Sequence, residues 1–465
     1  MLRDPATGAI VAIGRAPHEL VARDDGTSEQ DPAWWIDAVQ IAVRDAMRSG
    51  RFEIGGIGVS GQQHGLVCLD ARDRPVRAAK LWNDTTTAGE AVQLTAKLGG
   101  RDRVLELTGN LLLTGYTAPK MAWLAAHEAD AYARTIRMCL PHDYLNLWLT
   151  GRFVTEPGDA SGTAYFDVRG RRYSDEVLAA LDDRRDWAAT LPPIAPSLEI
   201  IGTLRREAAD ALGLVAGIPV SAGGGDNMCA AIGTDAVAEG PVVVSLGTSG
   251  TAFSFRSEPA IDPLGEAAAF CDSTGGWLPM GVTLNCTSAT EWARALFGMD
   301  HAAVDAAVAN GQVTGLTFLP YLSGERTPNR PEATGVFVGL RASHGPEDIV
   351  QAVVEGVTFG LAYALEALRR TGVTCTEVAL VGGGSTSDVW AQLCADVFAV
   401  PVSRPAITEA AAAGAARQAQ WAVDGVRPDA PPAPSRRFEP RPRPRLREAA
   451  DRTAALRDVA GAARL

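Results

Sequence analysis

The sequence predicts an α/β protein of two domains, and three observations support this prediction. With 465 residues the chain is too long for a single hydrophobic core. Three apolar runs each end in a glycine-rich turn, at AGGGDN (222–227), SLGTSGT (245–251) and LVGGGSTSD (380–388). Segments with helical periodicity lie between the strand-like runs, as in a sheet covered by helices. We expect the domain boundary at 233–240.

Composition and charge argue against several classes of function. The net charge of −12 and the pI near 5.1 disfavour nucleic acid or an anionic membrane as the main partner. No apolar run reaches the roughly 18 residues of a membrane span, and the N-terminus lacks the pattern of a signal peptide. The seven cysteines show no C-x-x-C spacing and the six histidines form no cluster. This usage predicts reduced thiols in a cytoplasmic enzyme without a structural metal.

The first half of the chain alternates strand and helix signals. Residues 9–21 resemble a strand, and Asp31-Pro32 is a helix cap followed by proline at the first helical position. A short buried strand is expected to end at Gly61, before Gln62, Gln63 and His64, and a hairpin-like segment follows at 66–76. A Gly-Tyr-Thr-Ala-Pro loop then leads into a helix that carries Lys120.

The second half contains the longest helix signal. Residues 283–298 are predicted to be helical, and 346–372 have strong 3.6-residue periodicity. Between them, the segment 318–340 is dense in breakers and charges around Gly-Glu-Arg-Thr-Pro (324–328). Residues 377–402 repeat the order of strand, triple glycine and helix. The Pro- and Arg-rich residues 429–465 are expected to form a linker and a peripheral surface helix.

The stretch 218–255 carries the chemistry. The apolar run Ile218–Ala222 ends in three glycines and then Asp226, so a carboxylate stands at a strand end where a ligand can approach closely. Farther on, two strands flank a Gly-Thr-Ser-Gly turn (247–250), whose backbone N–H groups and hydroxyls can hold phosphate. A phosphate-binding turn next to a general base is what phosphoryl transfer to a hydroxyl requires.

Each candidate also has a purely structural interpretation. Asp226 could simply cap its helix, His64 could be a core histidine, and Lys120 could be a solvated residue at a helix start. Asp84 and Asp143 are equally ambiguous. No Walker G-x-x-x-x-G-K-[ST], no G-x-G-x-x-G and no G-x-S-x-G occurs, which disfavours a P-loop ATPase, a dinucleotide dehydrogenase and a serine hydrolase.

Taken together, the ordered motifs resemble the FGGY family of carbohydrate kinases over residues 9–450. The resemblance rests on SGQQHG (60–65), LWND (81–84), TGYTAPK (114–120), LPHDYLNLWLTG (140–151), DASGTAYFD (159–167), GGGDN (223–227), SLGTSG (245–250), FLPYLSGERTP (318–328) and LVGGGS (380–385). It implies two actin-like (ribonuclease H-like) domains with ATP and sugar in the cleft between them. We assign these to residues 1–235 (sugar) and 236–428 (nucleotide), followed by the tail 429–465.

The resemblance also implies roles for individual residues. Asp226 would be the general base that takes the proton of the terminal hydroxyl of a ketopentose, with D-xylulose favoured and D-ribulose the nearest rival. ATP with Mg²⁺ would be the phosphoryl donor, and a homodimer is left open. The implied sugar-side residues are Gln63, His64, Trp82, Asp84, Asp143 and Asn227, and the implied nucleotide-side residues are Gly247, Thr248, Ser249, Thr287, Glu291, Gly383, Gly384, Ser385 and Asp388. Gln63 departs from the methionine usual at this position, which leaves the ketose open.

One departure from the family pattern concerns the N-terminus. The family opens with a strand and turn of the kind G-I-D-x-G-T-(S/T), which form a first phosphate loop, and this sequence has no such motif. Because that strand would be central, its loss would expose two strand edges. We therefore expect severely reduced kinase activity from this 465-residue chain, restored by upstream residues. A non-catalytic sugar-binding relative is the alternative.

Overall fold

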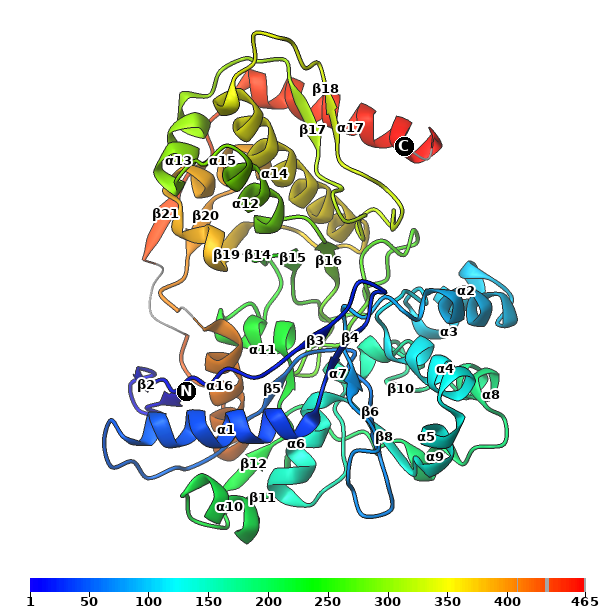
Figure 1. Cartoon of the computed structure of the whole chain (residues 1–465). Coiled ribbons are helices and arrows are strands. Elements are labelled where there is room, and N and C mark those ends of the chain that lie inside the picture. Colours follow the sequence, from blue (N-terminus) through cyan, green and yellow to red (C-terminus); the bar gives the residue numbers. More distant parts are fainter. Residues whose placement is uncertain (408, 431–434, 464–465) are drawn as a thin grey trace.

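The computed structural model describes residues 1–407, 409–430 and 435–463 and has two lobes (Figure 1). The N-terminal half forms the lower lobe in this view, and most of the C-terminal half forms the upper one. The chain crosses between the lobes after helix α11 (Asp226–Gly233) and enters strand β14 (Pro241–Leu246). This crossing lies within the predicted boundary region.

The upper lobe is built on a six-stranded sheet of order β16-β15-β14-β19-β20-β21. The remaining strands are β15 (Gly250–Phe253), β16 (Met280–Thr283), β19 (Glu377–Val381), β20 (Val402–Arg404) and β21 (Arg436–Phe438). Strand β14 pairs in parallel with β19 and antiparallel with β15. The run Val242–Val244 is fully buried, as expected for a central strand whose two faces are covered.

Helices cover this sheet. The longest, α14 (Pro346–Arg370), is accompanied by α12 (Thr287–Leu296), α13 (His301–Asn310) and α15 (Asp388–Phe398), and β17 (Thr317–Leu319) pairs with β18 (Val336–Val338). In the described part of the chain α14 is the one helix long and apolar enough to cross a membrane, and 72% of its most apolar window is buried inside the protein. It therefore fits the role of a core helix.

The lower lobe contains short paired strands surrounded by helices. The pairs that bear on the site are β5 (Ser60–Gly61) with β13 (Gly224–Gly225), in parallel, and β6 (Val67–Leu69) with β8 (Arg137–Cys139). The other strands are β1 (Leu2–Arg3), β2 (Ile10–Ala12), β3 (Val21–Ala22), β4 (Ser28–Gln30), β7 (Ala79–Lys80), β9 (Phe166–Asp167), β10 (Arg172–Tyr173), β11 (Ile200–Thr203) and β12 (Pro219–Ser221). The helices are α1 (Pro32–Met47), α2 (Ala88–Lys97), α3 (Arg101–Thr108), α4 (Thr117–His127), α5 (Ala129–Arg134), α6 (Pro141–Thr150), α7 (Pro157–Ala160), α8 (Asp175–Leu181), α9 (Trp187–Thr190) and α10 (Arg206–Leu212).

Local sequence signals identified several elements correctly. Helix α1 begins at Pro32, and the Asp31 side chain caps it by accepting from the N–H of Ala33 at 2.9 Å. The long periodic segment is α14, and 377–402 does form strand, glycine turn, helix and strand. The strand expected over 9–21 is shorter, because only β2 and β3 at its two ends pair. Six of the seven cysteines are buried, and all seven are free thiols.

The C-terminal residues pack in a way that differs from the prediction. Helix α16 (Ala410–Asp424) returns to the lower lobe and packs against α11, where Gly414 lies so close to the Cys229 carbonyl that a Cβ would clash. Strand β21 then adds an edge to the upper sheet, and α17 (Pro444–Ala463) packs beside β17 and α14. Leu446 and Ala449 of α17 are buried against the upper lobe while most of its other described residues are exposed or half-buried, so it is a surface helix, as expected, but one that is packed onto the lobe.

Candidate active site

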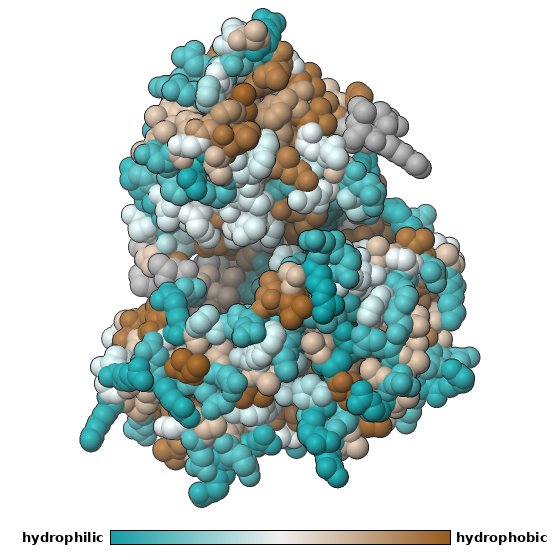
Figure 2. Space-filling view, viewed as in Figure 1, coloured by the Kyte–Doolittle hydropathy of each residue, from teal (hydrophilic) through white to brown (hydrophobic). Residues whose placement is uncertain are grey.

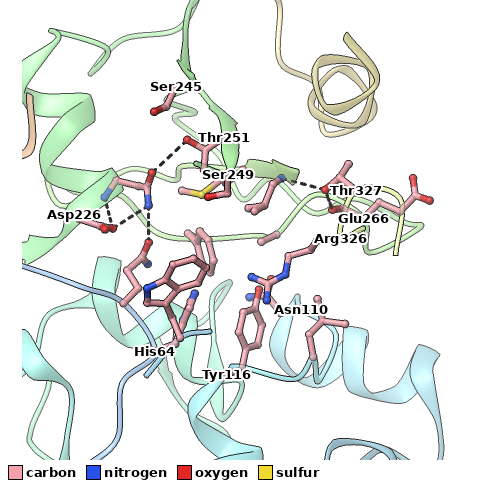
Figure 3. Close-up of a pocket in the computed structure, with 18 of the residues that line it drawn as sticks. His64, Asn110, Tyr116, Asp226, Ser245, Ser249, Thr251, Glu266, Arg326 and Thr327 are labelled. Atoms are coloured by element: carbon pink, nitrogen blue, oxygen red, sulfur yellow. Dashed lines mark hydrogen bonds between the residues drawn. The ribbon is translucent and has the colours of Figure 1, made fainter. Parts of the chain in front are cut away.

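The site lies where the two lobes meet, and the molecular surface is hollowed there (Figure 2). A cavity of about 350 Å³ is lined from the lower lobe by Gln63, His64, Trp82 and Tyr116, and from the segment that joins the lobes by Asp226 and Asn227. The upper lobe contributes the turn 247–249, Thr251, Glu266, Arg326 and Thr327 (Figure 3). Residues more than 250 positions apart in the chain therefore face one small space.

Asp226 is the first residue of α11 and follows directly on β13. Its Oδ1 accepts from the backbone N–H of Asn227 at 2.8 Å and from the Asn227 side-chain amide at 2.9 Å. Burial raises the pKa of Asp226 from 3.8 to about 6, although these hydrogen bonds act in the opposite direction. One carboxylate oxygen stays anchored while the other has no partner among the described residues, as a positioned general base requires.

Gln63 and His64 follow β5, the strand that pairs with β13, so both lie beside Asp226. The Gln63 Oε1 accepts from the Asn227 side-chain amide at 3.2 Å, and its Nε2 is buried without a partner among the described residues. His64 Nδ1 lies 2.7 Å from the Gly162 carbonyl, which can only accept, so this nitrogen carries the proton. Burial, with Lys120 and Arg326 nearby, lowers the pKa of His64 well below its usual value. The neutral ring therefore offers Nε2 as an acceptor.

Lys120 supports this loop from within the lower lobe. Its side chain is fully buried, and its ammonium group donates to the carbonyl oxygens of His64 (2.9 Å), Tyr116 (3.3 Å) and Gly115. His64 adopts a left-handed backbone conformation, with φ of 66°, which is strained for a residue with a side chain. Lys120 holds the carbonyl of that strained residue. Local sequence does not indicate this role, because a lone lysine opening a helix is usually solvated.

The turn 247–249 joins β14 to β15, and its carbonyl groups face α12. The Gly247 carbonyl accepts from the Thr287 N–H at 2.9 Å and the Thr287 hydroxyl at 2.8 Å, and the Thr248 carbonyl accepts from Cys286 and Ser288 N–H groups at 3.2 Å. The backbone carbonyl groups of the turn are thus occupied. The side-chain hydroxyls of Thr248 and Ser249 have no hydrogen-bond partner in the described chain. Gly247 and Thr248 line both the first cavity and a second one.

The second cavity, of about 630 Å³, lies in the upper lobe. Of the residues that the sequence assigned to the nucleotide, it is lined by Gly247, Thr248, Thr287, Glu291, Gly383 and Gly384. Ser249 lines the first cavity instead. Ser385 does not line either cavity and donates to the Gly382 carbonyl at 2.7 Å. Asp388 lies outside as well, paired with Arg404 at 2.9 Å and with Arg436.

On the sugar side, Trp82 and Asn227 line the first cavity, whereas Asp84 and Asp143 do not. Asp84 is fully buried, with its carboxylate bound by the Ser28 N–H at 2.9 Å and by Lys80 at 3.1 Å. Asp143 caps α6 by accepting from the Leu140 N–H at 2.9 Å. Tyr116, Glu266 and Arg326 line the cavity although the sequence did not single them out. The unusual density of charges and breakers at 324–328 was the available signal for Arg326.

The fold also assembles a buried ionic group behind the site. His142 Nδ1 lies 3.2 Å from Asp143 Oδ1 and 3.3 Å from Asp159 Oδ2, all three side chains being at most 1% exposed. Burial opposes a charge on His142, but hydrogen bonding and attraction by the two carboxylates outweigh it and raise its pKa well above the usual value. Its Nε2 lies 2.5 Å from the Ala222 carbonyl, four residues before Asp226. The histidines form no cluster with one another, but this one lies between two aspartates.

Comparisons with known proteins agree with this geometry. Residues 1–233 and 242–423 match the N- and C-terminal domains of the FGGY family of carbohydrate kinases. The xylulose kinase of Haemophilus influenzae is 41% identical over 429 residues (90% of this chain, 87% of the relative), and that of Streptomyces coelicolor is 40% identical over 426 residues (91% and 85%).

Among solved structures, the xyloylose kinase of Brucella ovis is similar with a TM-score of 0.91 and 37% identity, covering 99% of this chain and 96% of that one. The xylulose kinase of Bifidobacterium adolescentis has a TM-score of 0.85 and 31% identity, covering 97% and 96%. These likenesses confirm the predicted two-domain actin-like (ribonuclease H-like) fold. The chain belongs to the FGGY family of carbohydrate kinases.

Proposed function

We propose that this ATP-dependent carbohydrate kinase transfers the γ-phosphoryl group of ATP to O5 of D-xylulose, forming D-xylulose 5-phosphate. One observation carries the proposal: Asp226, with one free carboxylate oxygen and a pKa raised to about 6, lines a sugar-sized cavity that continues into the turn 247–249. The choice of D-xylulose is supported by the relatives, several of which are xylulose kinases.

In the proposed reaction, the free oxygen of Asp226 accepts the proton of the C5 hydroxyl. The O5–H bond breaks, O5 forms a bond to the γ-phosphorus, and the bond from that phosphorus to the oxygen of the ADP leaving group breaks. Because the transition state of phosphoryl transfer is loose, the base needs mainly to orient the hydroxyl and take the proton late. The N–H groups of the turn and the Thr248 and Ser249 hydroxyls are placed to donate to phosphate oxygens.

Mg²⁺ would enter with ATP. Hard divalent cations bind phosphate and carboxylate oxygens, and the donor set fits. Glu266, the other described carboxylate of the first cavity, is paired with Arg370 at 2.7 Å, whereas Asp226 has no cationic partner within 4 Å among the described residues. Asp226 would therefore face the ion, whose contribution is to neutralise charge on the phosphate groups.

Sugar recognition is assigned to the side chains of Gln63 and His64, on the loop after β5. His64, neutral and protonated on Nδ1, accepts a hydrogen bond from a sugar hydroxyl through Nε2. Gln63 can donate to a sugar oxygen through its buried Nε2, which has no protein partner among the described residues. Gln63 lies with Asp226 and Asn227 at the end of the cavity where the reacting hydroxyl would lie, whereas the His64 ring packs against Tyr116.

The test is a coupled assay of ADP release with a panel of sugars that includes D-xylulose and D-ribulose. We expect the highest kcat/KM with D-xylulose and a loss of 100- to 10,000-fold in kcat for Asp226→Asn, the usual contribution of a general base. Asp210→Asn is the matched control, because Asp210 is an exposed residue of α10. A higher kcat/KM for D-ribulose, or full activity of Asp226→Asn, contradicts the proposal.

Cytoplasmic location and assembly as a homodimer stay predictions. Calorimetry with D-xylulose alone separates a slow kinase from a protein that binds the sugar without turning it over.

A further inference from the structure

Arg326 stands on a loop that the upper lobe extends towards the lower one. This loop follows β17 and is held by Glu325, a buried carboxylate that accepts from the N–H groups of Leu284 (2.6 Å) and Arg326 (2.8 Å). Next to it, the buried Thr327 hydroxyl donates to the Glu266 carbonyl at 3.0 Å and accepts from the Val282 N–H at 3.0 Å. The backbone on both sides of Arg326 is therefore fixed before any ligand arrives.

The guanidinium group of Arg326 reaches across to the lower lobe. Its Nη2 donates to the Thr114 carbonyl at 3.3 Å and passes beside Gly115, where an added Cβ would lie 3.4 Å from it and would clash with the Trp82 carbonyl. Gly115 has φ of 94°, which favours glycine. In Figure 3 the Arg326 side chain points towards Tyr116, and Asp226 lies at the opposite side of the view.

The positive charge of Arg326 has no carboxylate within 4 Å in the part of the chain that the structure describes. Glu325 uses its oxygens on the backbone groups named above and on the Asn285 amide, and Glu266 is paired with Arg370 and Tyr363. A guanidinium has five N–H donors and no acceptor. One donor is occupied by Thr114, and the other N–H groups of Arg326, which lines the cavity, have no partner among the described residues.

Asn110, a polar residue near Arg326 in the cavity wall, already uses its side-chain amide in hydrogen bonds within the protein. Asn110 donates to the carbonyls of Ser161 (3.3 Å) and Ala269 (2.7 Å) and accepts from the Ala269 N–H at 2.8 Å, so its amide is a structural link. Arg326 is thus the charged donor available to a ligand there. A ketopentose with its C5 hydroxyl at Asp226 could extend its C1–C2 end towards Arg326, because both residues line the same cavity.

We propose that Arg326 determines specificity for a ketose by donating to the C2 carbonyl oxygen of the bound sugar. The inference rests on the proposed function, because the reacting hydroxyl at Asp226 sets the direction of the sugar. A ketone oxygen can only accept, and a guanidinium can only donate, so the two are matched. A hydroxyl at C2 can also accept, but it must turn its own hydrogen away from the guanidinium group, so it is the poorer partner for Arg326.

The test compares D-xylulose with xylitol, which carries a hydroxyl in place of the ketone, by calorimetric Kd without ATP. In Arg326→Met we expect roughly 10- to 100-fold weaker binding of D-xylulose, the usual effect of losing a charge-assisted hydrogen bond. Xylitol binding should change by less than about threefold, so the preference for the ketose collapses. The KM for ATP should stay within about twofold. Arg326→Lys should restore part of the preference.

Arg330→Met is the matched control, because Arg330 lies on the same loop with an exposed side chain. It should leave both Kd values unchanged. Equal losses for D-xylulose and xylitol in Arg326→Met, or an unchanged Kd for D-xylulose, would overturn the proposal. Failure of the proposed function looks different: the unaltered protein would prefer another ketose, and the same variants then test Arg326 with that ketose and its polyol.

Discussion

The replacement of Asp226 by Asn tests both the chemistry and the electrostatics of the site. The change is nearly isosteric, and the amide oxygen can still accept from the backbone N–H and side chain of Asn227, which now bind Oδ1. What is lost is the ability to take a proton. What is also removed is an ionised carboxylate whose pKa is raised because burial disfavours the charged form.

The size of the effect on stability follows from that pKa. A rise from 3.8 to about 6 corresponds to about 3 kcal/mol, at about 1.36 kcal/mol for each tenfold change in proton affinity. Asp226 is only partly buried, at the wall of a cavity that admits water. We therefore expect ionisation of Asp226 to lower the free energy of unfolding by about 1 to 3 kcal/mol. The folded state binds the proton more tightly than the unfolded state, so this stabilisation is complete below pH 3.8 and is lost as the pH rises through about 6.

At pH 7.5 the Asn variant should therefore be more stable than the unaltered protein while its kcat falls 100- to 10,000-fold. Thermal unfolding followed from pH 4 to 8 is the assay, with Asp210→Asn as the control. The Tm of the Asn variant should exceed that of the unaltered protein by almost nothing at pH 4. This difference should increase between pH 4 and 6 and stay constant above pH 6. An Asn variant that is less stable at pH 7.5, or a difference that does not change with pH, would refute the electrostatic reasoning.

Three further predictions concern neighbouring groups. The kcat/KM for D-xylulose should rise as the pH increases through about 6 and level off above about 7, because only ionised Asp226 accepts the proton; a flat profile from pH 5 to 8 contradicts this. Thr248→Ala should raise the KM for ATP about 5- to 10-fold in steady-state assays without changing the calorimetric Kd of D-xylulose, and an altered sugar Kd would count against the assignment. Lys120→Met should weaken D-xylulose binding about tenfold and lower the Tm by several degrees, because the His64 carbonyl and its neighbours lose their buried donor; Lys97→Met, at an exposed site, is the control, and equal behaviour of the two variants would contradict the role.

Local signals predicted much of the fold and the centre of the site. The cap at Asp31, the periodicity of α14 and the glycine-rich segments after β12, β14 and β19 each depend on residues within one or two turns of chain. Asp226 and the turn 247–249 were found in the same way, and both line the first cavity. Such short-range patterns are visible in a sequence because the backbone geometry they require is decided locally.

Other features depend on contacts between distant residues. Asp84 and Asp143 stand at element ends just as Asp226 does, yet packing brings the Ser28 N–H to Asp84 and Asp159 to the histidine beside Asp143, and neither carboxylate lines the cavity. Lys120 becomes a buried donor to three carbonyls only because α4 packs beneath the His64 loop. Nothing in the neighbouring sequence distinguishes these outcomes.

The sequence by itself determined the fold class and the family, and it located Asp226 and the turn 247–249 as the proposed base and the proposed phosphate-binding turn, since each is encoded in a short segment with its own backbone requirements. Only the tertiary structure decided that α16 returns to the lower lobe, that α17 packs on the upper one, and that Arg326 lines the first cavity together with residues of the lower lobe. These depend on the burial of apolar surface between segments hundreds of residues apart. That driving force has no direction of its own, so the partners of each segment are settled only when the whole chain packs.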